Sequence, residues 1–294
     1  MSYKFKVMLI LGVLTLPLMF FLTKRITTPG RGFLSINGLS TGMYYLAVFG
    51  ISLAITIIVL LCTLLFSAKG RIQLDIEGEL QKNGYSDKYY EMLSAEVNRL
   101  AAKNDTKDNL YTDYVSKLAN YYLIKGRYTE AYNTINTLNL NVLKYNARKD
   151  DAGKMRLLMY YDVQLCVCDD LQDVERAHRI MDDAKKFINV MSGNRSAMMK
   201  LAVNEFCSTY YAMIGSYDIA TEYATKMAGS DPVNGKFYGN MQFIKILCHQ
   251  GRFDEAVALL DQTEAEVKKK KIIQDMIRST REEIERKRCQ WQTN

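Results

Sequence analysis

The sequence is poor in the residue types from which most catalytic and metal sites are built. It contains only two histidines, His178 and His249. Cys166 and Cys168 are close in the sequence, but two residues apart on a helix their side chains point about 200° away from each other. A glycine-rich phosphate loop and a local arrangement of Ser, His and Asp are also missing. We therefore expect no metal, no cofactor and no enzymatic activity.

An enzyme with an unrecognised site is the alternative. Such a site would contain a strongly perturbed carboxylate or histidine buried in a cleft. The paired acids Asp169-Asp170 and Asp182-Asp183 lie in helical segments with basic neighbours. We therefore interpret both pairs as part of a solvated helix face.

Acidic residues are absent from the first 71 positions, which contain seven Lys or Arg. The chain has 39 basic and 32 acidic residues in total, so the remainder carries 32 of each. The formal net charge of +7 therefore belongs to residues 1–71. The rest of the chain gives no electrostatic support for binding to nucleic acid.

The same region contains two long uncharged runs. Residues 43–66 are almost continuously apolar, and as a helix they would extend roughly 36 Å, enough to cross a hydrocarbon layer of about 30 Å. The first run, at about 7–23, contains Pro17 and could instead be a signal peptide, but Phe20–Arg25 offers no small-residue cleavage site. We predict a membrane anchor at 1–71 with two transmembrane helices, at about 7–23 and 43–66, and both termini on one side.

The cysteines indicate on which side of the membrane the helical domain lies. Four basic residues flank the terminal side and three lie on the connection, which decides little under the positive-inside rule. Beyond residue 71 there are five cysteines, an odd number embedded in helical patterns, as is typical of free thiols in a reducing compartment. We expect an integral protein of the cell membrane with a cytoplasmic helical domain.

A short motif occurs three times between residues 126 and 256. Each copy has a glycine, an aromatic residue two positions later and an alanine three positions after that. A glycine of this kind ends a helix in a left-handed cap, and the alanine lets the next helix cross closely. The motif therefore predicts three helical hairpins, at Gly126, Tyr128 and Ala131, at Gly215, Tyr217 and Ala220, and at Gly251, Phe253 and Ala256.

This motif resembles the middle of a tetratricopeptide repeat, a two-helix unit of about 34 residues that stacks into a solenoid. Gly215 and Gly251 are 36 positions apart, and Pro232 stands where the family ends its second helix. A degenerate copy around Ala177 fills the longer gap before Gly215, with Gln172 in place of the glycine, so we expect that turn to be built differently. The predicted units are 112–145, 158–191, 201–234 and 237–270, with connectors at 146–157 and 192–200.

These patterns predict an all-α chain in which a transmembrane hairpin precedes a tetratricopeptide-like solenoid. Residues 72–110 form a juxtamembrane helical region, in which Ser86-Asp87 caps a helix after Asn83-Gly84. The solenoid occupies 111–270 in about four repeats. Residues 271–294 form a helix that caps the end of the core. The basic residues of that helix could alternatively meet anionic lipid.

In this family the first helices of successive repeats line the concave surface, so matching positions should form a ladder. The positions eleven residues before the crossing alanines are Asn120, Cys166, Thr209 and Lys245, and those four residues earlier are Ser116, Asp162, Glu205 and Met241. The acids at the centre of this ladder would repel a terminal carboxylate. We therefore predict a protein partner that offers an internal or basic segment.

The resemblance thus implies a membrane-anchored scaffold or adaptor whose groove binds a peptide or helix. The alternatives are a lipid-binding protein that uses the basic terminal helix, and an enzyme. The sequence predicts no nucleic-acid partner and leaves the oligomeric state open.

Overall fold

The computed structural model describes residues 68–293, apart from 104, 107, 194–195, 231–234 and 268–269, and a few helical positions between 46 and 57. The described residues form helices and contain no strand. They belong to two units, Met1–Glu77 and Gly78–Asn294. The second unit contains the features described below.

The predicted membrane anchor falls almost wholly on residues that the structure leaves undescribed. The span at 7–23 lies outside the described residues, and the span at 43–66 is described at six positions only. Among the helices that are described, none has the length and apolar character needed to cross a membrane.

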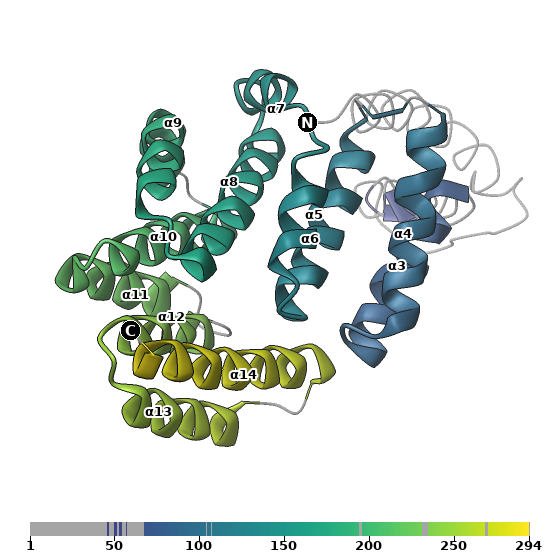
Figure 1. The fold of residues 1–294 in the computed structure, drawn as a ribbon. Coiled ribbons are helices and arrows are strands. Elements are labelled where there is room, and N and C mark those ends of the chain that lie inside the picture. The colour runs from purple at the N-terminus through teal and green to yellow at the C-terminus, as the bar shows by residue number, and fades with distance from the viewer. Residues whose placement is uncertain are drawn as a thin grey trace, which may run out of the picture. The chain divides into compact units, whose positions relative to one another are not determined.

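The helices follow one another with short connections (Figure 1). They are α3 (Ala68–Asn83), α4 (Asp87–Ala102), α5 (Asn109–Ile124), α6 (Tyr128–Ile135), α7 (Leu140–Ala147), α8 (Asp151–Leu171), α9 (Val174–Ser192), α10 (Ala197–Met213), α11 (Tyr217–Ser230), α12 (Gly235–His249), α13 (Phe253–Glu266) and α14 (Lys271–Thr293).

Four hairpins are closed by turns of one geometry. Gly126, Gly215 and Gly251 have φ of 66°, 77° and 73°, which confirms the predicted left-handed backbone. At each turn the residue's own N–H donates to the carbonyl three positions back, and the next N–H donates to the carbonyl five positions back. This pair of bonds satisfies carbonyls that the helix end would leave open.

The turn at Gln172 corrects one expectation. Gln172 has φ 53° and ψ 32°, and the N–H of Asp173 donates to the Cys168 carbonyl at 2.9 Å, as in the glycine turns. The prediction of a different turn was therefore wrong. A left-handed backbone costs a residue with a Cβ roughly 1–2 kcal/mol. The hydrogen bonds and the packing of α8 against α9 offset that cost.

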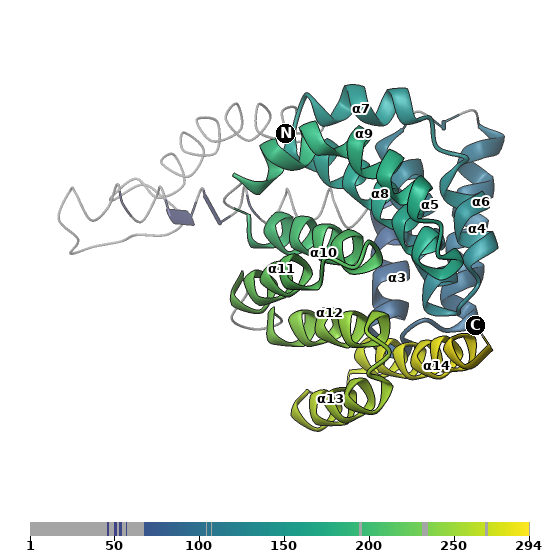
Figure 2. The same ribbon diagram turned by 60° about the vertical axis from the view of Figure 1, so that its left-hand side comes forward.

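The crossing alanines are fully buried, with 0% exposure at Ala131, Ala177, Ala220 and Ala256. The first helices of the hairpins also pack on one another, since α8 contacts α5 and α10, and α10 contacts α12. Figures 1 and 2 show this succession of hairpins from α5/α6 to α12/α13.

An extra helix separates the first hairpin from the second. α7 packs against α8, and its N-cap Asn139 accepts hydrogen bonds from the N–H groups of Asn141 and Val142. The Asp150 carboxylate likewise accepts from the Gly153 N–H at 2.7 Å and starts α8. The stretch 146–157, expected as a connector, is therefore largely helical, because α7 extends to Ala147 and the Asp150 cap starts α8 at Asp151.

The two flanking segments are helical, as expected. Ser86 caps α4 by accepting a hydrogen bond from the Tyr89 N–H. On α14, Ile277 and Ile284 are buried in one cluster with Phe237 and Leu260 of α12 and α13. α14 therefore covers the apolar end of the last hairpin.

The hairpin geometry predicts that two substitutions in the third hairpin will destabilise it. Gly215→Val would place a β-branched residue at φ 77°, and Ala220→Leu would overpack the crossing of α10 and α11. We expect each to lower the free energy of unfolding by about 1 to 3 kcal/mol. Thermal unfolding followed by circular dichroism measures this.

The matched control is Thr221→Leu, because Thr221 is the exposed neighbour of Ala220. It should change stability by less than about 0.5 kcal/mol. If Gly215→Val and Ala220→Leu both leave the thermal midpoint unchanged, the hairpin assignment fails.

Candidate binding groove

A small cavity of about 140 Å³ lies where α5, α8, α10, α12 and α14 meet. Most of the predicted ladder residues line it, although they come from four helices far apart in the sequence. These residues are Asn120, Asp162, Cys166, Glu205, Met241 and Lys245. We call this cavity and its walls the groove.

The other two ladder residues lie outside the cavity. Ser116 is buried at 1% exposure, and Thr209 is buried at 1% and donates a hydrogen bond to the Gln242 side-chain oxygen at 3.3 Å. Their positions therefore belong to the packing between first helices.

Two carboxylic acids that line the groove are Asp162 and Glu205, and the charge of Glu205 acts on Asp162. Burial raises the pKa of Asp162 to about 7, and the neighbouring Glu205 adds to this rise. Burial also raises the pKa of Glu205. Asp162 Oδ1 is buried and has no hydrogen-bond partner among the described residues. The groove therefore contains an acidic pair that its own side chains leave incompletely satisfied.

Lys245 is the basic residue at this cavity. Burial alone would lower its pKa, but the surrounding acidic groups, which include Glu283 and Glu205, outweigh burial and raise it. The thiol of Cys166 has a pKa well above its ordinary value because of burial and the nearby Asp162. Cys166 is thus a neutral thiol, not an activated nucleophile.

The sequence reasoning missed the wall supplied by α14. Met276, Thr280 and Glu283 of α14 line the same cavity as the ladder residues. Their spacing of four and three residues places them on one helical face. No repeat alignment could find them, because α14 lies outside the repeats.

Asp169 corrects the interpretation of a solvated acidic pair. It is 4% exposed, and its carboxylate accepts hydrogen bonds from Lys287 Nζ at 3.0 and 3.1 Å and lies 2.7 Å from His249 Nε2. Burial alone would raise the pKa of Asp169, but Lys287 and the hydrogen bond with His249 hold it well below its usual range.

One signal in the sequence could have found this pair. Asp169 stands eight residues before its crossing alanine, where the other hairpins have Leu123, Ala212 and Cys248. An acid at an otherwise apolar position of the repeat indicates a buried charge with a partner. That partner, Lys287, could not be identified from the pattern, because α14 has no register with the repeats.

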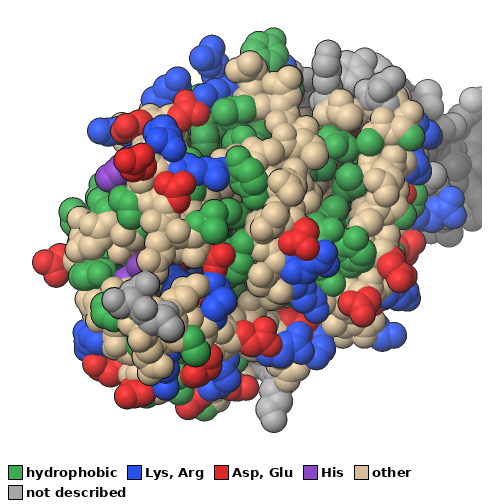
Figure 3. Space-filling model, in the orientation of Figure 1, with side chains coloured by type: hydrophobic (Ala, Val, Ile, Leu, Met, Phe, Trp, Pro, Cys, Tyr) green, Lys and Arg blue, Asp and Glu red, His purple; other side chains and the backbone are tan. Residues whose placement is uncertain are grey.

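Basic residues at the end of α14 contact acids of the hairpins. Arg286 pairs with Asp170 and donates a hydrogen bond to Tyr128 Oη at 3.0 Å. Arg288 Nη2 lies 3.0 Å from Asp254 Oδ1. On the face shown in Figure 3, basic and acidic side chains are interspersed over the region of α13 and α14.

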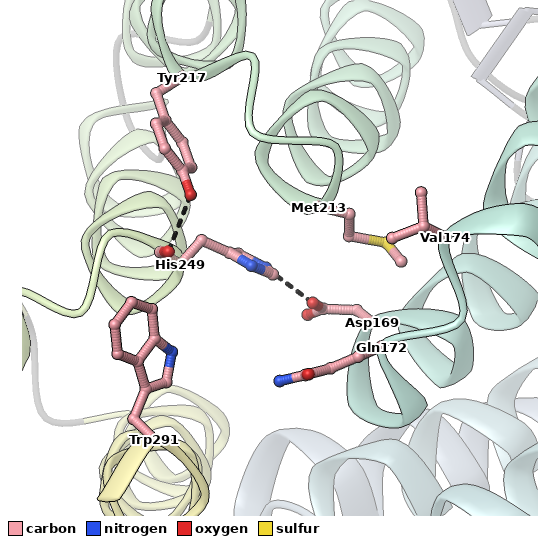
Figure 4. A pocket seen from close by; sticks show the side chains of 7 residues that line it. All are labelled: Asp169, Gln172, Val174, Met213, Tyr217, His249 and Trp291. Atoms are coloured by element: carbon pink, nitrogen blue, oxygen red, sulfur yellow. Dashed lines mark hydrogen bonds and ion pairs between the residues drawn. The ribbon is translucent and has the colours of Figure 1, made fainter. Parts of the chain in front are cut away.

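A second cavity, of about 580 Å³, lies at the turn ends of the last three hairpins (Figure 4). Gln172 and Trp291 point towards it, and Tyr217 Oη donates to the backbone oxygen of His249 at 2.8 Å. The pair of Asp169 and His249 forms part of its wall. This cavity and the groove thus share Asp169.

Other candidate chemistry is limited in the part of the chain that the structure describes. No group of three or more His, Cys, Asp or Glu side chains there is placed to hold a metal ion. Cys168, Cys207 and Cys248 are buried, Cys166 is partly buried and Cys289 is exposed.

Comparison with known proteins adds no relative to these observations. No protein-family model, curated protein or solved structure matches this chain.

Proposed function

We propose that this chain is a membrane-anchored interaction protein. In this proposal two transmembrane helices, at 7–23 and 43–66, tether a tetratricopeptide-like solenoid whose groove binds a basic segment of a protein partner. The observation that carries the proposal is the groove itself, because six ladder residues from four successive first helices line one cavity.

The repeated hairpin geometry supports this assignment. Four turns share one hydrogen-bond pattern, and all four crossing alanines are fully buried. Stacked helical repeats present a continuous surface of matching positions, which suits an extended or helical ligand.

The charge of the groove supports a basic ligand. Burial raises the pKa of both Asp162 and Glu205, and the charge of Glu205 adds to the rise at Asp162, while Lys245 only partly opposes it. A Lys or Arg side chain brought between them would neutralise this pair and make charge-assisted hydrogen bonds. A terminal carboxylate would place a further acidic group beside this pair.

The proposal is tested by affinity capture from detergent-solubilised membranes. Asp162→Lys combined with Glu205→Lys should abolish capture of the partner that the wild-type chain retains, because the groove would then repel a basic segment. Helicity should remain close to that of the wild type, since both side chains face the cavity.

The matched control reverses two exposed acids on α9, with Asp182→Lys and Glu175→Lys. It introduces the same change in net charge outside the groove and should leave capture intact. Undiminished capture by the groove variant would contradict the groove assignment.

The anchor and its orientation are tested separately. The full chain should stay in the membrane fraction under alkaline carbonate, because two apolar helices hold it there. In intact cells a membrane-impermeant thiol reagent should leave Cys289 unlabelled, since the cytoplasmic side is closed to it. Release by carbonate would contradict the anchor, and labelling of the exposed Cys289 would reverse the orientation.

An enzyme is the second candidate, and the observation that favours it is the carboxyl of Asp162. Burial raises its pKa to about 7, near the value that suits a general acid or base. Turnover of a small molecule by the full chain, lost in Asp162→Asn with helicity retained, would support this candidate over the interaction protein.

A further inference from the structure

One wall of the groove is a helix of the same chain that lies outside the repeats. The face of α14 formed by Met276, Thr280, Glu283 and Lys287 repeats at intervals of four, three and four residues. Its first three residues line the cavity, and Lys287 Nζ pairs with Asp169 Oδ2 at 3.0 Å. α14 also contacts α5 and α12, so it lies between the first and last hairpins of the solenoid.

Each end of α14 packs against a glycine turn, the first end at Gly84 and the last end at Gly251. The Asp275 carboxylate accepts a hydrogen bond from the Tyr85 N–H at 2.8 Å, and a Cβ at Gly84 would lie 2.9 Å from Lys271 Cγ. A Cβ at Gly251 would lie 2.9 Å from Trp291 Cζ3. Gly126 and Gly215 have no such neighbours within 4 Å. The helix is therefore held at its ends.

The fit of α14 is incomplete in the middle of the groove. Its Glu283 lies near Lys245 and its Lys287 pairs with Asp169, so two of its charges complement the groove. Of the α14 residues that line the cavity none is a cation, and Ser279 and Thr280 are neutral. Asp162 Oδ1 stays buried without a hydrogen-bond partner in the described part of the chain.

We propose that α14 occupies the groove in cis as a stand-in for the partner, and that the partner is a basic amphipathic helix that replaces it. The partner helix carries a Lys or Arg at the place of Thr280, where it reaches Asp162 and Glu205. This inference rests on the proposed binding function of the groove.

The partner helix and α14 compete because both would make the same contacts with the groove. A helix with the polar face of α14 keeps the pairs with Asp169 and Lys245, and one added cation satisfies the acidic pair with charge-assisted hydrogen bonds. The occupant in cis has the advantage of high effective concentration. The partner therefore needs this extra interaction to displace α14.

The test uses the full chain in detergent and two labelled synthetic peptides with the sequence of residues 271–293. One is the native sequence and the other carries Thr280→Lys. A third peptide with Thr280→Glu is the charge control. Fluorescence anisotropy measures binding, and hydrogen exchange measures the protection of α14 in the full chain.

Two full-chain variants accompany the wild type. The first, Asp275→Asn with Arg286→Gln, weakens both ends of α14 and leaves the buried Ile277 and Ile284 in place. The second, Arg281→Gln, removes an exposed pair of α14 with Asp261 and Glu264 on α13 and serves as the control.

We expect the Thr280→Lys peptide to bind the wild type about ten-fold more tightly than the native peptide and to release the protection of α14. The native and Thr280→Lys peptides should bind the weakened variant more tightly than the wild type or the Arg281→Gln control. The Thr280→Glu peptide should bind weakest.

Three outcomes would overturn the inference. Binding of the Thr280→Lys peptide with undiminished protection of α14 would mean that α14 does not occupy the binding site. Equal affinity of the native and Thr280→Lys peptides would show that Asp162 and Glu205 do not bind the added cation. Failure of all peptides, combined with partner capture that still depends on Asp162 and Glu205, would reject the helical partner and leave the proposed function standing.

Discussion

Replacing Lys287 with methionine should lower the free energy of unfolding of the helical unit by about 3 to 5 kcal/mol. Lys287 is 6% exposed and Asp169 is 4% exposed, so the substitution would leave a carboxylate buried without its main cation. Chemical denaturation of the full chain in detergent, followed by far-ultraviolet circular dichroism, measures the change.

The effect of pH on this pair has a definite sign. Lys287 and His249 hold the pKa of Asp169 below its usual range, so the stabilisation is present above about pH 4, the range of an unfolded carboxyl. It is lost only as the pH falls through the lowered pKa of the folded chain. The cost of Lys287→Met should therefore be similar at pH 6 and pH 8.

Two further variants make this prediction specific. Asp169→Leu combined with Lys287→Met replaces the pair by apolar groups, with leucine as at the matching Leu123, and should recover most of the stability. Arg288→Met removes a pair with the fully solvated Asp254 and should cost less than about 1 kcal/mol. A cost below that value for Lys287→Met as well would contradict the buried pair.

The stability of the wild-type unit should fall as the pH rises from 5 to 8, and Asp162→Asn should remove most of this fall. The folded carboxyl of Asp162 keeps its proton to a pKa of about 7, whereas the unfolded one loses it near pH 4. Between these values the folded state binds more protons, so its stability decreases with rising pH.

The size of this effect follows from the pKa shift and from the partial exposure of Asp162. Each pKa unit corresponds to about 1.4 kcal/mol, and because Asp162 is only partly buried, solvent screening reduces the expected total to about 1 to 3 kcal/mol. Glu205 contributes with the same sign, since burial raises its pKa too. The measurement is the thermal midpoint across this pH range.

Asp182→Asn is the control, because Asp182 is exposed on α9. It should leave the pH profile of the wild type unchanged. A profile of Asp162→Asn that parallels the wild type would show that Asp162 is ionised throughout and that the acidic pair is solvated. In that case the requirement for a cation from the partner would lose its physical basis.

The sequence by itself determined the helical class and the turns. Gly126, Gly215 and Gly251 could be recognised because a left-handed backbone favours glycine, and Ala131, Ala220 and Ala256 because a close helix crossing needs a small side chain. Both requirements are local or repeat at a fixed spacing, so they leave a pattern in one sequence. The same register identified six of the eight predicted ladder residues as lining one cavity.

Only the tertiary structure decided what fills the groove and which charges are buried. Gln172 adopts the glycine-like turn because the surrounding hydrogen bonds outweigh its local cost. Asp169 is buried, not solvated, because Lys287 reaches it from 118 positions away. α14 forms one wall of the groove and is held in place by contacts between residues as distant as Tyr85 and Asp275. Such contacts join parts of the chain with no common register, so no periodicity in the sequence could reveal them.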